Sequence, residues 1–109
     1  MTRRRGEIYY AELEGVGRKP VLIVSWNAIN EGLRRPICAL ITSTDRERSL
    51  PTHVLIEPVE SGLQDTSFVL CHALIVLTEE QIDPAPVGEL PSWKQAEVEM
   101  ALRYALDLA

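Results

Sequence analysis

Short apolar runs alternate with short polar segments over the first three quarters of the chain, and this pattern predicts a small β structure. We expect five strands, over residues 6–13, 20–26, 36–43, 52–57 and 67–74. The polar segment 27–35 between the second and third strands is predicted as a loop, and so is the charged segment 44–50. Strands this short, separated by turns at this spacing, are typical of a small closed or partly closed barrel.

The remaining quarter predicts two helices. Thr78 and Gln81 have the spacing of a capping box, and the prolines at 84 and 86 end that first helix early. Ser92 and Gln95 repeat the capping pattern and begin a longer helix. One face of the longer helix carries apolar side chains at helical spacing, namely Val98, Ala101, Leu102, Ala105 and Leu108. This helix is expected to pack on the barrel as a lid.

Length and composition favour one globular domain over residues 1–109, with 46% hydrophobic residues available for its core. The apolar runs are too short to span a membrane and no signal peptide is visible, so a cytoplasmic location is expected. Cys38 and Cys71 lie in apolar strands and are expected to be reduced and buried. No His or Cys spacing suggests a metal site, and we expect no cofactor.

The net charge of −5 argues against nucleic-acid binding when the chain is taken as a whole. The charge is unevenly distributed, however. Residues 1–49 carry a net charge of +3, whereas residues 50–109 carry −8. A basic site on one face of an acidic protein is therefore compatible with the composition.

The segment 15–20, Gly-Val-Gly-Arg-Lys-Pro, brings the two cations Arg18 and Lys19 to a tight turn directly before an apolar strand. Cations held at the rim of a sheet are a common way to build a phosphate site. A solvated basic turn is the alternative interpretation of these residues.

Further segments occur in a characteristic order and spacing, and together they resemble the MazF/PemK family of toxin endoribonucleases from about Arg4 to Leu108. These segments are residues 5–9 (Arg-Gly-Glu-Ile-Tyr), the turn 15–20, 40–43 (Leu-Ile-Thr-Ser), 50–54 (Leu-Pro-Thr-His-Val), 62–63 (Gly-Leu), 67–71 (Ser-Phe-Val-Leu-Cys) and the C-terminal helix. The resemblance implies a mainly β fold with a C-terminal helix, the small SH3-like barrel of the MazF/PemK/CcdB toxin type.

The resemblance also implies an activity and partners. Members of this family cleave single-stranded RNA at short sequences by attack of the ribose 2′-OH, without a metal ion. They work as homodimers and are held inactive by a cognate antitoxin. We therefore expect a cytoplasmic toxin with single-stranded RNA, an antitoxin and a second copy of itself as partners.

The catalytic residues implied by the resemblance are an arginine just before the loop proline and a threonine at the end of the third strand. Thr42 matches the threonine. Lys19 occupies the arginine position and Arg18 precedes it by one residue, so either cation is a candidate. His72 stands where some members place an acid–base carboxylate; it is a candidate acid or base, or a structural strand residue.

Other residues are candidates for RNA contacts around the presumed groove. They are Ser25, Trp26, Asn27, Ser43, Arg34 and Arg35. Trp26 would stack on a base or belong to a dimer core, and the two arginines would steer the RNA backbone or form a solvated loop. His53 is a weaker candidate, and Trp93 is expected to pack in the fold.

The leading hypothesis is therefore a toxin endoribonuclease. The alternative is a catalytically impaired member of the family that binds an antitoxin or RNA, as suggested by Lys19, the short turn at 15–17 and His72. A toxin that binds gyrase on the same fold is a third reading, which no residue here favours.

Overall fold

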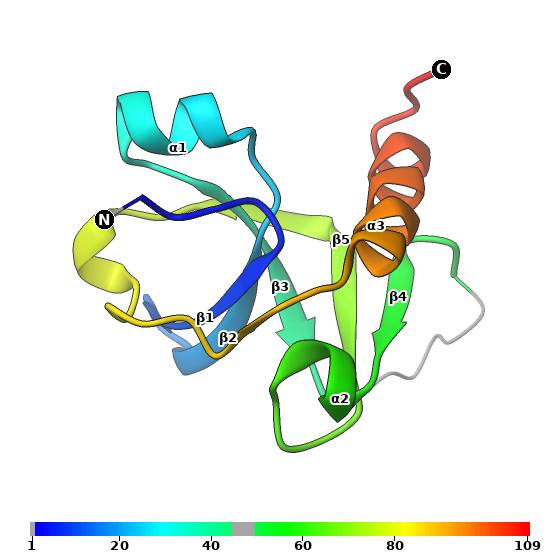
Figure 1. Cartoon of the computed structure of the whole chain (residues 1–109), viewed down its shortest axis with the longest axis horizontal. Coiled ribbons are helices and arrows are strands. Elements are labelled where there is room, and N and C mark those ends of the chain that lie inside the picture. The colour runs from blue at the N-terminus through cyan, green and yellow to red at the C-terminus, as the bar shows by residue number, and fades with distance from the viewer. Residues whose placement is uncertain (1, 45–49) are drawn as a thin grey trace.

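The computed structural model describes residues 2–44 and 50–109, and within them one antiparallel sheet forms the body of the molecule (Figure 1). Its strands are β1 (Glu7–Leu13), β2 (Gly17–Ile23), β3 (Ile37–Thr42), β4 (His53–Ile56), β5 (Ser67–Val76) and β6 (Gly88–Glu89). Their order across the sheet is β4-β5-β3-β2-β1-β6. The helices are α1 (Asn27–Leu33), α2 (Pro58–Ser61), α3 (Ser92–Ala105) and the 3₁₀ turn η1 (Glu79–Gln81).

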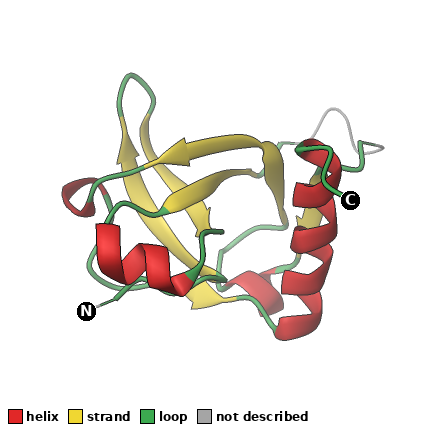
Figure 2. Cartoon of the chain, turned by 90° about the horizontal axis from the view of Figure 1, so that it is seen from above, coloured by secondary structure: helices red, strands yellow, loops and turns green. Residues whose placement is uncertain are grey.

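The central strands are buried on both faces, because successive side chains of a strand point to opposite sides. Ile8 and Leu22 belong to a core that also contains Val98 and Ala101 of α3, whereas Tyr9 and Ile23 belong to a second core on the other face. The sheet curls, and α3 lies along one side of it (Figure 2). This curled sheet with a C-terminal helix confirms the predicted mainly β fold.

Residues 27–35, predicted as a loop, instead contain the helix α1. A helix of 7 residues is too short to be stable alone, so a tertiary contact must hold it. That contact is the buried Asn30, whose amide group bonds the backbone oxygen of Ser25 and accepts a bond from the Ser25 hydroxyl. The Ser25 hydroxyl also accepts a bond from the amide of Ile37, at 2.9 Å. One polar cluster therefore fastens α1 to the start of β3.

β2 spans Gly17–Ile23, three residues earlier than the predicted strand 20–26, because its first residues pair with β1. The β1–β2 hairpin continues to the pair Leu13↔Gly17, so the loop is shorter than the sequence suggested. Pro20 lies inside β2, opposite Tyr10 of β1, rather than at the first residue of the strand.

The two predicted capping boxes have different outcomes. At η1 the box forms, with the Thr78 amide donating to Gln81 Oε1 at 3.0 Å. At α3 the prediction was wrong: Pro91 is the N-cap, and the Gln95 side chain donates to the carbonyl of Leu90. The predicted packing face of α3 is confirmed in part, because Val98 and Ala101 are buried whereas Leu108 lies exposed beyond the end of the helix.

Both cysteines are free and buried, as predicted. Burial raises the pKa of Cys38 and of Cys71 to about 12, which keeps both as unreactive thiols at neutral pH. None of the helices in the described ranges is long and apolar enough to cross a membrane. Most of the charged loop predicted over 44–50 falls on residues 45–49, which lie outside the described residues.

Gly62 ends α2 and fixes the direction of the chain that follows it. Its φ is +80°, and a Cβ at this position would lie 2.5 Å from the carbonyl oxygen of Val87. Gly15 has a similar φ of +75° but has nothing within 4 Å of its Cβ position. A side chain at Gly15 would meet only the strain of a left-handed backbone, whereas a side chain at Gly62 would meet that strain and a steric clash as well.

We expect Gly62→Ala to lower the free energy of unfolding by about 2 kcal/mol or more, since backbone strain and overlap with Val87 add. Gly15→Ala should cost only about 1 kcal/mol, from the backbone alone. Urea denaturation of the two variants measures the difference. Equal losses would show that the packing of Gly62 against Val87 contributes nothing to stability.

Candidate active site

The sheet opens between β2 and β3, and a cavity forms where the strands diverge. Their pairing is confined to Val21↔Leu40, Leu22↔Ala39 and Ile23↔Cys38. Residues 17–20 of β2 pair with β1 alone. Pro20 has no amide hydrogen to offer a ladder, and the β2–β3 pairing ends at the residue next to it.

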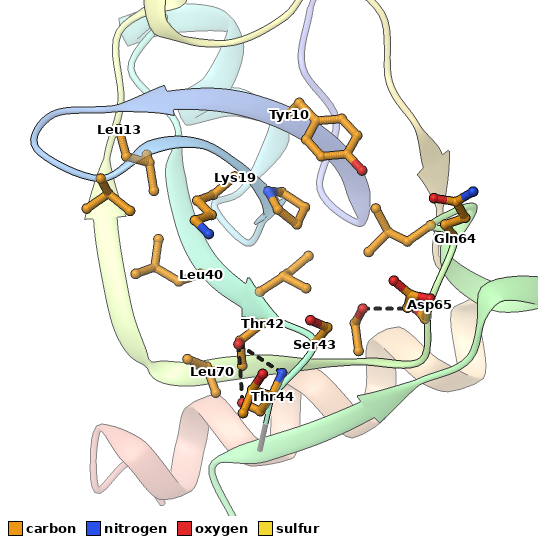
Figure 3. A pocket seen from close by; sticks show the side chains of 15 residues that line it. Tyr10, Leu13, Lys19, Leu40, Thr42, Ser43, Thr44, Gln64, Asp65 and Leu70 are labelled. Atoms are coloured by element: carbon orange, nitrogen blue, oxygen red, sulfur yellow. Dashed lines mark hydrogen bonds between the residues drawn. The ribbon is translucent and has the colours of Figure 1, made fainter. Parts of the chain in front are cut away.

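The cavity has a volume of about 440 Å³, a size suited to a nucleotide-sized ligand (Figure 3). Its walls are the β1–β2 hairpin, the end of β3 and the segment that joins α2 to β5. The lining residues are Tyr10, Leu13, Val16, Lys19, Pro20, Leu40, Ile41, Thr42, Ser43, Thr44, Leu63, Gln64, Asp65, Ser67 and Leu70. Apolar side chains cover much of the surface, with polar groups gathered at the β3 end and on the loop before β5.

Lys19 supplies the positive charge of the cavity. It lies on β2, and Figure 3 shows its ammonium group directed into the space between β2 and β3. Within residues 2–44 and 50–109, no carboxylate forms an ion pair with it. Lys19 is thus a cation available to a ligand.

The end of β3 contributes hydroxyl groups to the same cavity. The hydroxyl of Thr42 accepts a bond from the amide of Thr44 at 3.1 Å and donates its own hydrogen to the carbonyl of that residue at 3.2 Å. These bonds fold the chain into a tight turn and leave one lone pair of the Thr42 oxygen unused. The next residue, Ser43, is exposed and lines the cavity as well. The predicted residues Lys19, Thr42 and Ser43 are therefore brought together.

Arg18 does not line the cavity, although the register places it on the same face of the β1–β2 hairpin as the lining residues Tyr10 and Pro20. Its guanidinium group pairs with both carboxylate oxygens of Asp83, at 2.9 and 2.7 Å, and lies 4.7 Å from the ring centre of Tyr10. The hydrogen bonds that Arg18 donates to Asp83 raise the pKa of the Arg18 guanidinium group. Arg18 supports a ring that lines the cavity, but is not itself a lining residue.

His72 lies outside the cavity, which favours the second of its two interpretations, a structural residue of the strand. β5 shifts register between the pairs Leu40↔Leu70 and Ala39↔Leu74, and His72 falls in the extra residues of this irregularity. Its Nδ1 is 3.2 Å from the hydroxyl of Thr52, and its ring stacks on His53 with 5.2 Å between the ring centres. We therefore withdraw His72 as the acid–base group of the cavity.

His53 is closer to the candidate site than the sequence suggested. It lines a second hollow of about 310 Å³ together with Ser43, Leu55, Thr66 and Phe68. Ser43 borders both hollows, so the two are neighbours. Ser43 thus joins the cavity to a second hollow that is bordered by residues of β4 and β5.

The remaining predicted RNA contacts lie at the opposite end of β2 and β3. Lys19 and Trp26 are seven residues apart along an extended chain, roughly 20 Å. Ser25 is 5% exposed, and its hydroxyl is occupied by Asn30 and Ile37, so it is withdrawn as a ligand contact. The others surround α1 and do not line the cavity: Trp26, Asn27, Arg34 and Arg35.

Trp26 and Trp93 are both largely exposed, at 68% and 58%. The packing role predicted for Trp93 was therefore wrong within this chain; its ring lies 5.1 Å from the ammonium group of Lys94 on the surface of α3. Asn27 accepts a bond from the amide of Arg5 and so also contributes to the fold.

Sequence reasoning missed five polar lining residues, namely Tyr10, Thr44, Gln64, Asp65 and Ser67. For the last three, the nearest signal in the sequence was the pair Gly62 and Leu63, one of the segments on which the family resemblance rests. The chemistry lies just after that motif, in the loop that Gly62 directs toward the cavity. Among the described residues, no three His, Cys, Asp or Glu side chains group as metal ligands.

Comparison with known proteins places this geometry in a family. The family model described as "PemK-like, MazF-like toxin of type II toxin-antitoxin system" matches residues 4–106. Endoribonuclease MazF6 of Mycobacterium tuberculosis is 31% identical over 115 residues, covering 99% of this chain and 100% of the relative. Endoribonuclease EndoA of Bacillus subtilis is 27% identical over 114 residues, covering 99% and 97%.

Solved structures agree with the sequence relatives. A mycobacterial endoribonuclease, solved in complex with its cognate antitoxin, superposes with a TM-score of 0.87 at 31% identity, covering 98% of this chain and 97% of that chain. The Mycobacterium tuberculosis toxin MazF-mt6 superposes with a TM-score of 0.83 at 27% identity, covering 94% and 98%. The chain thus belongs to the PemK-like, MazF-like toxins of type II toxin–antitoxin systems.

Proposed function

We propose that this toxin is a sequence-specific endoribonuclease that cleaves single-stranded RNA in the cavity between β2 and β3. The observation that carries the proposal is the position of Lys19. It brings a cation that has no ion pair within the described residues into the same cavity as the hydroxyl groups of Thr42 and Ser43, at the β3 end of the opened sheet. The endoribonuclease relatives of comparable length support the assignment.

The chemistry that this arrangement supports is transfer of the phosphoryl group to the neighbouring ribose hydroxyl. The 2′ oxygen attacks phosphorus and the 5′ oxygen leaves, giving a 2′,3′-cyclic phosphate and a 5′-OH. Charge gathers on the phosphate oxygens as this occurs. Lys19 neutralises that charge as a point cation, and the hydroxyls at the end of β3 are placed to bond the phosphate. DNA lacks the 2′-OH and is not a substrate.

We also propose that the toxin acts in the cytoplasm as a homodimer and is neutralised by a cognate antitoxin. The mycobacterial structure with its antitoxin supports the second partner. Trp93, Met100 and Tyr104 support a protein contact on α3, since they are exposed at positions i, i+7 and i+11 of one helix face. This face points away from the buried side chains Val98 and Ala101.

The experiment is to incubate purified protein with several long single-stranded RNAs in the presence of EDTA. We expect discrete fragments that carry a cyclic phosphate and a 5′-OH. If the folded protein binds the RNAs and cuts none of them, the enzyme assignment fails. The alternative, a catalytically impaired member that binds RNA or an antitoxin, would then hold, with Lys19 in place of arginine as its physical origin.

A further inference from the structure

We propose that Asp65 is the general base of the cleavage reaction and accepts the proton of the attacking 2′-OH. The inference rests on the proposed function and names a group that this function requires. Some members of the family place an acid–base carboxylate at the position that His72 occupies in this chain. His72 does not line the cavity and stacks on His53 instead. Some other residue must therefore supply the base.

Within residues 2–44 and 50–109, Asp65 is the one carboxylate that lines the cavity. The other titratable lining groups are Tyr10 on β1 and Lys19 on β2, and the lining residues on β3 are apolar or carry hydroxyls. Lys19 faces the phosphate in the proposed function, and Tyr10 carries a hydroxyl rather than a carboxylate. The carboxylate of Asp65 is thus the group of the cavity that is ready to accept a proton.

The backbone of Asp65 is fixed, although its side chain is exposed. The hydroxyl of Ser67 donates to the Asp65 carbonyl at 3.0 Å, and the hydroxyl of Thr66 donates to Glu57 at 2.9 Å. Gly62 anchors the start of the loop against Val87. Within the described residues, the Asp65 carboxylate itself has no ion pair or hydrogen bond. A fixed loop with an uncommitted carboxylate is suited to meet a ligand.

The charges across the cavity match the two ends of the reacting group. Lys19 comes from β2 and the hydroxyls of Thr42 and Ser43 come from the end of β3, where they suit the anionic phosphate, and Asp65 comes from the loop before β5 (Figure 3). The neighbouring ribose hydroxyl would lie toward this loop. In this arrangement, Lys19 faces the phosphate oxygens and Asp65 faces the 2′-OH.

RNA cleavage by this route needs only the RNA, Asp65 and water. The O2′–H bond breaks and its proton passes to the Asp65 carboxylate, while the 2′ oxygen forms a bond to phosphorus. The bond from phosphorus to the 5′ oxygen breaks, and that oxygen keeps the electron pair and takes a proton from water. Asp65 then returns its proton to the solvent, so the enzyme is regenerated.

The test compares Asp65→Asn with Asp107→Asn, a matched control outside the cavity. Asp107 lies beyond the end of α3 with a φ of 55°, which asparagine tolerates well. A long single-stranded RNA is cleaved first by the wild type to map a cut site. A chimera with a 2′-deoxy sugar at that site then serves as an uncleavable probe of binding.

We expect Asp65→Asn to slow single-turnover cleavage by about a hundredfold or more and to remove the fall in rate on the acid side of the pH profile. Binding of the 2′-deoxy probe and the Tm should be preserved. Asp107→Asn should match the wild type in every measurement. Asp65→Glu should recover part of the rate, because it restores the carboxylate.

Each contrary outcome points to a different failure. If the wild type cuts RNA and Asp65→Asn cuts it within about threefold of that rate, Asp65 is not the base and the proposed function stands. If Asp65→Asn loses probe binding in proportion to cleavage, Asp65 positions RNA instead. Loss of the acid-side limb in His72→Gln, with Asp65→Asn unaffected, would return the role to His72. If the wild type itself cuts nothing, both proposals fall.

Discussion

Replacing Lys19 by alanine is expected to lower the rate of RNA cleavage by about a hundredfold or more, whereas Arg18→Ala should lower it by less than about tenfold. Loss of one group that stabilises charge in a transition state typically costs 10²–10³ in rate. Lys19 is the cation that lines the cavity. Arg18 is outside it and already pairs with Asp83 through two bonds.

Single-turnover cleavage of one mapped site measures both variants under identical salt conditions. Lys19→Arg is the matched control, and it should retain cleavage because the charge is kept and a planar fork is added. The opposite order of effects would mean that RNA draws Arg18 away from Asp83 and into the site. Small and equal effects would return both residues to a solvated basic turn.

Removal of the Thr42 hydroxyl is the second large effect. Thr42→Val keeps the shape of the side chain but removes the oxygen that both faces the cavity and bonds the amide of Thr44. We expect a loss of at least about tenfold in cleavage, together with a looser turn around Ser43. This minimum is below that for Lys19, because the Thr42 hydroxyl already donates to the Thr44 carbonyl.

Thr42→Ser is the control for this prediction, since it keeps the hydroxyl and loses only a methyl group. It should cleave within a few-fold of the wild type. Both variants should keep the wild-type Tm within a few degrees, because Thr42 lies at the end of β3 rather than in the core. Full activity in Thr42→Val would show that the hydroxyl serves only the turn.

The strands were predictable from the sequence because apolar residues recur along them in short runs. α1 was not, because its stability comes from the hydrogen bonds that join Asn30, Ser25 and Ile37 rather than from an apolar stripe. These contacts link residues whose partnership appears only after the chain has folded. The capping pattern at Ser92 failed for a related reason, since the Gln95 side chain found the Leu90 carbonyl instead.

The candidate site was partly predictable. Lys19, Thr42 and Ser43 were identified from local patterns, and the structure brings them to one cavity. The choice between Lys19 and Arg18 depended on the pairing of Arg18 with Asp83, a residue far along the chain whose position is known only from the folded structure.

Long-range geometry decided the rest of the site. The position of His72 depends on a register shift between β3 and β5. The position of Asp65 depends on how Gly62 turns the chain toward β3. Neither feature has a periodic signal in the sequence.

The central claim is that RNA binds between β2 and β3, and amide chemical shifts test it most directly. The ¹⁵N-labelled protein is titrated with the 2′-deoxy chimera of the mapped site. We predict that the amides of Lys19, Ser43 and Gln64 shift, while those of Trp26 and Arg35 beside α1 stay in place. Shifts confined to the α1 end, with the cavity amides unmoved, would contradict the account.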